Sequence, residues 1–179
     1  MWLSEKQPCS AADRRRAMLK NAALGGMFAA LAVLLSPLSI PIGPSRCLPF
    51  QHAINAVAGV MLGPAWACGS AFAASAIRFM LGTGTILAFP GSMFGAAAVG
   101  LAAKFLSERR RFWAGLAEPC ATGTIGAFAA ALIASPPGGL FPMFTTLSVA
   151  FLMSSVPGAA LGCAILRLRG IKAIRILSL

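Results

Sequence analysis

Basic residues of this chain gather in three clusters that long apolar segments separate. Among its 15 lysines and arginines, only Arg46 and Arg78 lie outside the clusters. Basic residues stay on the cytoplasmic side of a bilayer, so this pattern predicts a membrane protein with all three clusters on the same side. The clusters are Lys6, Arg14, Arg15, Arg16 and Lys20; Lys104, Arg109, Arg110 and Arg111; and Arg167, Arg169, Lys172 and Arg175.

The composition supports this interpretation. Hydrophobic residues make up 58% of the chain and charged residues 11%, which is unlike a soluble domain. A crossing helix needs about 20 residues, so 179 residues allow about six short-looped crossings. The net charge of +11 lies at predicted helix ends, where topology and anionic lipid headgroups account for it. We therefore expect no nucleic-acid partner.

Six apolar segments predict an all-α integral membrane fold with six transmembrane helices. An even number of crossings places both termini in the cytoplasm, in agreement with the basic clusters. No small-residue cleavage site follows the first apolar run, so we expect it to be retained as a helix rather than removed as a signal peptide. The expected organisation is a basic cytoplasmic tail at 1–16, the transmembrane domain at 17–167 and a second basic tail at 168–179. The expected helices are 17–35, 50–62, 65–81, 91–106, 112–134 and 144–166.

Residues 36–49 contain four prolines, which forbid a regular helix. The segment is nevertheless apolar, with Leu38, Ile40, Ile42 and Leu48. Irregular backbone at membrane depth must be buried in protein or line a cavity. We predict an outer loop that packs down as a lid or plug.

Three polar residues lie at the outer end of the second predicted helix. Gln51, His52 and Asn55 can share one helix face, because they lie three or four residues apart. Polar side chains in a crossing helix must face the protein interior or water. They could form helix-to-helix hydrogen bonds, or they could contact a ligand below the lid.

Two charged residues within predicted helices also need an explanation. Arg78 could cap carbonyl groups at its helix end, extend toward the outer surface, or present its guanidinium to a ligand. Glu118 precedes Pro119, and it could form a structural pair with a basic group, sense protons, or bind ligand. Its position nearer the inner end argues against direct contact with an external ligand and favours the structural pair.

No motif for catalysis or for nucleotide binding occurs in the chain. The run Gly82-Thr83-Gly84-Thr85 has the glycines of a phosphate loop, but G-x-x-x-x-G-K-[ST] is absent. We expect an outer turn with the hydroxyls of Thr83 and Thr85 near a cavity mouth. The chain has one histidine, and its five cysteines form no C-x-x-C pair. It also has no serine elbow and no zinc motif. The sequence therefore gives no support for an enzyme, a metal site or a cofactor.

Small residues of the first predicted helix recur four apart. One row is Ala22, Gly26 and Ala30, and the other is Gly25 and Ala29. Such rows let a second helix approach closely. That helix could belong to this chain or to a partner subunit.

Several of these segments resemble the ThiW family. The similarity is carried by Leu35-Ser36-Pro37-Leu38-Ser39-Ile40-Pro41-Ile42-Gly43-Pro44, by Pro49-Phe50-Gln51-His52-Ala53-Ile54-Asn55, by Leu81-Gly82-Thr83-Gly84-Thr85-Ile86-Leu87-Ala88-Phe89-Pro90-Gly91, and by Glu118-Pro119 with Thr122-Gly123-Thr124. It covers about residues 20–165. ThiW proteins are the predicted substrate-binding S components of energy-coupling factor (ECF) transporters.

The resemblance implies a six-helix S component in a bacterial cell membrane that captures a thiamine precursor. The precursor that we expect is hydroxyethylthiazole. It also implies a transmembrane coupling subunit and two cytoplasmic ATPases as partners. The family's Ala-x-x-x-Ala motif for the coupling subunit is absent in strict form, and the two small-residue rows are its nearest matches.

A small neutral heterocycle needs an apolar pocket with a few placed hydrogen bonds. Phe50 and Phe89 could supply the apolar surface, while Gln51, His52 and Asn55 could bond a ring nitrogen or hydroxyl. Arg78, Thr83 and Thr85 complete the predicted substrate site.

Two alternatives remain open. A stand-alone proton-coupled carrier would use Glu118 as its coupling acid. A membrane scaffold would bind no ligand at all.

Overall fold

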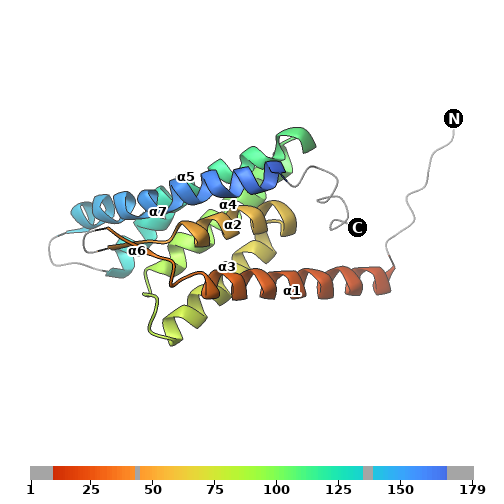
Figure 1. Cartoon of the computed structure of the whole chain (residues 1–179), viewed down its shortest axis with the longest axis horizontal. Helices are drawn as coiled ribbons and strands as arrows, with labels where there is room; N and C mark the ends of the chain where they lie inside the picture. Colours follow the sequence, from red (N-terminus) through yellow and green to blue (C-terminus); the bar gives the residue numbers. More distant parts are fainter. Residues whose placement is uncertain (1–9, 43–44, 135–138, 169–179) are drawn as a thin grey trace.

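The structure is a computed structural model that describes residues 10–42, 45–134 and 139–168. The chain forms a bundle of six helical segments and one short β-hairpin (Figure 1). This confirms the all-α class. The segments are α1 (Ala11–Leu34), α2 (Pro49–Leu62), α3 (Pro64–Met80), α4 (Ala88–Phe105), a composite fifth segment from Glu108 to Ala134, and α7 (Leu140–Leu168).

The fifth segment changes its winding three times. It begins as the 3₁₀-helix η1 (Glu108–Leu116), continues as α5 (Ala117–Ala121), widens into the π-helical turn η2 (Thr122–Gly126) and ends as α6 (Ala127–Ala134). The sequence predicts a single helix here at 112–134, with a kink at Pro119. Single π turns are rare and occur often at functional sites, so the turn at Thr122 marks this part of the bundle for attention.

Helix α1 begins at Ala11, whereas the sequence predicts a start at residue 17. Ser10 caps the helix, because its hydroxyl oxygen accepts a hydrogen bond from the Ala12 N–H at 3.3 Å. Asp13 in the first turn favours the positive end of the helix dipole. Part of the predicted polar tail is therefore helical.

The proline-rich segment contains a two-stranded hairpin, β1 (Ile40–Ile42) and β2 (Ser45–Cys47), where the sequence predicts only irregular backbone. Strand pairing satisfies backbone groups that an irregular loop would leave exposed to an apolar environment. Two bonds fasten the hairpin to α7. The Cys47 thiol donates to the Met153 carbonyl oxygen at 3.1 Å, and the Leu48 N–H donates to Ser154 Oγ at 3.2 Å.

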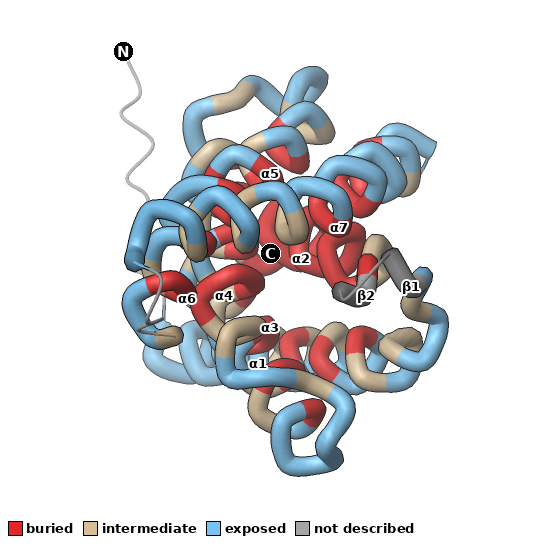
Figure 2. Tube along the Cα trace, turned by 90° about the vertical axis from the view of Figure 1, so that its left-hand side faces the viewer, coloured by how far each residue is buried: buried red, intermediate tan, exposed pale blue. Residues whose placement is uncertain are grey.

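Helix α2 lies at the centre of the bundle. It contacts α1, α3, α4, α7 and η1, and its residues 51–60 are all buried. Figure 2 shows the buried residues along the inside of the bundle, with α2 among them. Its 14 residues span about 21 Å, at about 1.5 Å per residue. Protein rather than lipid surrounds this short helix.

Within the described ranges, four helical segments are long and apolar enough to cross a membrane: α1, α4, the fifth segment and α7. Helices α2 and α3 are shorter, with 14 and 17 residues. Large apolar side chains are exposed on the outside of the bundle, including Phe105 at 86% and Phe141 at 74%. Such a surface fits lipid rather than water.

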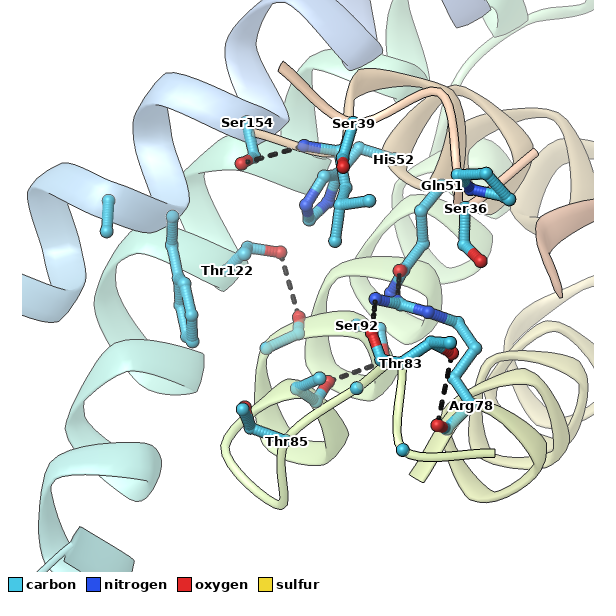
Figure 3. Close-up of a pocket in the computed structure, with 18 residues that line it drawn as sticks. Ser36, Ser39, Gln51, His52, Arg78, Thr83, Thr85, Ser92, Thr122 and Ser154 are labelled. Carbon is cyan, nitrogen blue, oxygen red and sulfur yellow. Dashed lines mark hydrogen bonds between the residues drawn. The ribbon is translucent and has the colours of Figure 1, made fainter. Parts of the chain in front are cut away.

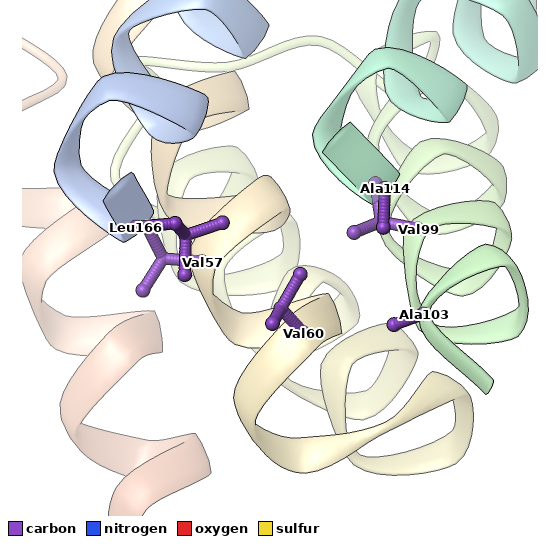
Figure 4. Close-up of a cluster of buried hydrophobic side chains, with 6 residues drawn as sticks. All are labelled: Val57, Val60, Val99, Ala103, Ala114 and Leu166. Carbon is purple, nitrogen blue, oxygen red and sulfur yellow. The ribbon is translucent and has the colours of Figure 1, made fainter. Parts of the chain in front are cut away.

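Close backbone contacts hold the helices together. A Cβ added at Gly100 would lie 2.4 Å from the Pro64 backbone nitrogen, so only glycine permits this approach of α4 to the α2–α3 turn. A small apolar cluster fills the adjacent space (Figure 4). Its buried members are Val57, Val60, Val99, Ala103, Ala114 and Leu166.

Candidate ligand-binding cavity

A cavity of about 660 Å³ lies beside the hairpin (Figure 3). Its volume falls within the range of small-molecule sites, about 300–1,000 Å³. Five elements and two connecting segments contribute to its wall: Ser36, Pro37, Ser39 and Leu48 around the hairpin; Gln51 and His52 of α2; Arg78 of α3; Gly82, Thr83, Gly84 and Thr85 of the α3–α4 loop; Ala88, Gly91 and Ser92 of α4; Thr122 of η2; and Ala150, Phe151 and Ser154 of α7.

Five of the eight predicted substrate-site residues line this cavity: Gln51, His52, Arg78, Thr83 and Thr85. The other three lie outside its wall. Asn55 is buried and its Nδ2 donates to the Ser92 carbonyl oxygen at 3.3 Å. Phe89 packs edge-on against Phe72 and Phe79, with ring centroids 5.6 and 6.2 Å away. Phe50 is half-buried beside the cavity residues of α2.

Arg78 joins α3 to α2 and to the α3–α4 loop. Its Nη1 donates to Gln51 Oε1, and its Nη2 donates to the Thr83 carbonyl oxygen at 3.3 Å. The α3–α4 loop also bonds to the backbone of Arg78: the N–H groups of Thr83 and Gly84 both donate to the Arg78 carbonyl oxygen. The side chain is 3% exposed, and its Nε is buried with no partner among the described residues.

Glu118 lies directly behind the cavity wall, where the structure pairs it with His52. The distance between His52 Nδ1 and Glu118 Oε1 is 2.5 Å. The Thr122 hydroxyl lies 3.1 Å from the same carboxylate oxygen and 3.0 Å from the Gly91 carbonyl oxygen. Glu118 is 0% exposed, and its Oε2 is buried without a partner in the described part of the chain. The acid thus touches the predicted polar cluster without lining the cavity.

Two glycines give this pair its position. A Cβ at Gly95 of α4 would lie 2.6 Å from Glu118 Oε1 and 2.3 Å from Thr122 Oγ1. A Cβ at Gly158 of α7 would lie 2.5 Å from the His52 Cβ. Helix α4 therefore packs closely against the Glu118 carboxylate, and α7 packs closely against His52.

Several lining residues escape the sequence analysis. Ser92 and Ser154 are small polar residues in apolar helices, and serine is common in such helices as a packing residue. Phe151 carries no distinguishing pattern at all. The polar run after Glu118 could have indicated Thr122, since a hydroxyl one turn from a buried acid often bonds to it.

The two small-residue rows of α1 face in different directions. Gly25 and Ala29 are buried inside the bundle, where the Ser70 hydroxyl of α3 donates to the Gly25 carbonyl oxygen at 2.8 Å. Ala22, Gly26 and Ala30 are exposed. Helix α3 of the same chain therefore packs against the row Gly25 and Ala29. The row Ala22, Gly26 and Ala30 is accessible to a partner helix.

The arrangement suits the binding of a small organic molecule. Hydroxyl, amide, imidazole and guanidinium groups converge on a cavity whose wall also includes Leu48 and Phe151. No group of three or more metal-ligating side chains occurs among the residues that the structure describes.

Comparison with known proteins agrees with this geometry. The chain matches no curated protein and no solved structure. Residues 22–170 match the family described as thiamine-precursor transporter protein (ThiW). This match covers most of the chain, and it implies transport rather than catalysis. The family match and the apolar, membrane-length helices together show that the chain belongs to the ThiW family of thiamine-precursor transporters.

Proposed function

We propose that this protein is the substrate-binding membrane subunit of an ECF-type importer, and that it captures hydroxyethylthiazole from outside the cell. The family supports a thiamine precursor as the substrate class. The ligand would occupy the cavity beside the hairpin, with its ring against Phe151 and Leu48 and its polar atoms toward Gln51, His52 and Arg78.

The observation that carries this proposal is the convergence of polar groups in one small cavity. Gln51, His52 and Arg78 are each at most 6% exposed, yet all three line it. Buried polar groups are costly unless they are bonded, so a cavity that collects them favours a ligand that bonds them. Its volume exceeds what a single heterocycle with a short side chain fills, which leaves room for water.

The proposed topology has six crossings and both termini in the cytoplasm of a bacterial cell. Two observations support it. The three basic clusters need one common side. The start of α1 and the end of α7 lie at the same end of the bundle, and the hairpin lies at the opposite end (Figure 1). The hairpin and the cavity would then face outward.

The proposed partners are a transmembrane coupling subunit and two cytoplasmic ATPases. The exposed row Ala22, Gly26 and Ala30 of α1 is our candidate contact for the coupling subunit. Small residues would let a partner helix approach the α1 backbone closely.

A proton-coupled carrier is a second candidate, because Glu118 is fully buried and is bonded to the only histidine of the chain. Uptake assays in cells without coupling ATPases separate the two. Uptake that persists there and is lost in Glu118→Gln would favour the carrier. Uptake that requires the ATPases would favour the importer subunit.

Titration calorimetry of the purified protein with hydroxyethylthiazole tests the binding site itself. The double variant Gln51→Ala/His52→Ala should bind at least tenfold more weakly than the wild type. Thr124→Ala is the control, since this hydroxyl is exposed and donates to the Cys120 carbonyl oxygen of its own helix. Equal affinity of the double variant and the wild type would place the ligand elsewhere.

A further inference from the structure

We propose that Glu118 sets the hydrogen-bonding polarity of the cavity, by holding the imidazole proton of His52 on Nδ1 so that Nε2 accepts a hydrogen bond from the ligand. Another part of the wall, at Arg78 and Gln51, offers mainly N–H donors. The cavity is then built for a small heteroaromatic molecule with a hydroxyl donor on one side and an acceptor atom on the other. This inference rests on the proposed function, and it adds the orientation of the ligand and a positioning role for Glu118.

The contact with Glu118 assigns the imidazole proton of His52. A carboxylate has acceptor oxygens only, and a neutral imidazole has one N–H and one lone pair. The 2.5 Å contact between His52 Nδ1 and Glu118 Oε1 therefore places the proton on Nδ1. Such carboxylate–histidine pairs fix the tautomer and the orientation of the ring.

The other ring nitrogen of His52, Nε2, is directed toward the cavity. His52 lines the cavity, whereas Glu118, its partner, does not. Since Nδ1 is turned toward the acid behind the wall, Nε2 is the polar atom that the ring can present to a ligand. Figure 3 shows the imidazole at the edge of the space that Thr122, Ser92 and Thr83 also border.

The pair of His52 and Glu118 is held rigidly by its neighbours. Gly95 leaves no room for movement of the Glu118 carboxylate toward α4, and Gly158 holds α7 against the His52 Cβ. The Thr122 hydroxyl adds a second contact to the same carboxylate oxygen at 3.1 Å. A ring flip would bring a carbon in place of Nδ1 and leave a fully buried carboxylate without its partner, which is costly.

Another part of the cavity wall has the opposite polarity. A guanidinium has five N–H groups and no acceptor. Arg78 uses Nη1 and Nη2 for Gln51 and Thr83, and its Nε–H is buried without a partner in the described residues. Because the Gln51 carbonyl oxygen already accepts from Arg78, the side-chain amide of Gln51 has mainly N–H groups left to offer. A ring nitrogen of the ligand would accept a hydrogen bond from the Gln51 amide or from a remaining Nη N–H of the Arg78 guanidinium.

The hydroxyl of the ligand therefore belongs at His52, and its ring acceptor belongs at Arg78 and Gln51. A thiazole alcohol carries both groups. Its methyl ether keeps the ring and nearly the same shape, but it has no hydrogen to donate. It would set an oxygen lone pair against the Nε2 lone pair. Sites that bond a substrate hydroxyl discriminate strongly against analogues that lack it.

The experiment compares the two compounds by calorimetry on the full chain in lipid nanodiscs at pH 8. The ether should bind the wild type at least tenfold more weakly than the alcohol. In Glu118→Leu no oxygen remains to accept from Nδ1, so the ring proton can move to Nε2. An alcohol can accept as well as donate, and an ether can accept. The ratio of the two affinities should then fall to about threefold or less, even if both affinities decrease. Thr124→Ala should keep the wild-type ratio.

Nitrogen NMR gives an independent readout, because His52 is the only histidine of the chain. With ¹⁵N-labelled histidine, the ligand-free wild type should show a protonated Nδ1 and a bare Nε2. Glu118→Leu should lose this fixed assignment and show a protonated Nε2. Equal binding of the ether and the alcohol to the wild type, or a protonated Nε2 in its spectrum, would overturn the inference. If the spectrum shows a bare Nε2 and neither compound binds, the thiazole assignment of the proposed function fails and the positioning role of Glu118 stands.

Discussion

Replacing Gly95 with alanine tests whether helix packing holds the acid–imidazole pair in place. The new Cβ would lie 2.6 Å from Glu118 Oε1, 3.0 Å from its Cδ and 2.3 Å from Thr122 Oγ1. Ordinary contacts to a Cβ are about 3.4–4 Å, so these groups must move by roughly an ångström or more. Both residues are 0% exposed, so neither group can move outward into solvent or lipid.

The magnitude follows from three contributions. Overpacking a core costs about 1–3 kcal/mol. Weakening a hydrogen bond to a charged group costs about 1.5–3 kcal/mol. The higher helix propensity of alanine offsets about 1 kcal/mol of this loss. We expect Gly95→Ala to lower the free energy of unfolding by about 2–5 kcal/mol, and to weaken thiazole binding at least tenfold through the displaced His52.

Gly69→Ala is the matched control. Gly69 lies inside α3, and a Cβ there would meet nothing within 4 Å. This variant should be as stable as the wild type or more stable by up to about 1 kcal/mol. Unfolding by sodium dodecyl sulfate in mixed micelles, followed by far-ultraviolet circular dichroism, measures both variants. If the two variants unfold at the same detergent fraction, the reasoning about close packing at Glu118 is wrong.

Three further predictions concern the bundle, the cavity and the topology. Gly100→Ala should destabilise the protein by at least as much as Gly95→Ala. Its Cβ would lie 2.4 Å from the Pro64 backbone nitrogen, and backbone atoms shift less readily than side chains. The same detergent titration measures this variant. Arg78→Lys should weaken thiazole binding about tenfold in calorimetry, because a single ammonium group cannot reproduce the planar fork that joins α2 to the α3–α4 loop. The topology is tested in a cysteine-free background with an impermeant maleimide added to intact cells. The reagent should label Leu38→Cys, a position beside the hairpin that is 54% exposed, and should not label Ser107→Cys. The reverse pattern would contradict the proposed topology.

The sequence predicts most of the helical bundle, because composition and basic clusters report directly on the membrane. Helix ends are less predictable: the Ser10 cap extends α1 into a segment that its charge marks as a tail. The hairpin is missed, since four prolines argue against helix and give no positive indication of strand pairing. The π turn at Thr122–Gly126 likewise has no sequence pattern that announces it.

The polar site is predictable in part, and for a physical reason. Buried polar residues are rare in crossing helices, so Gln51, His52 and Arg78 attract attention. The contact between His52 and Glu118 joins residues 66 apart in the chain, and no local pattern encodes such a distance. The position of Glu118 along its predicted helix suggests separation from the outer site, yet the structure brings the acid against it.

The enclosure of α2 by other helices has a consequence for how the protein responds to its lipid environment. Helices that face acyl chains must tilt or bend when the bilayer thickens or thins, since their apolar length is matched to it. Helix α2 is insulated from that adjustment by the helices around it, and it carries two of the cavity's principal side chains. The outer helices can therefore follow the thickness of the membrane while recognition stays anchored to a part of the molecule that hardly touches lipid.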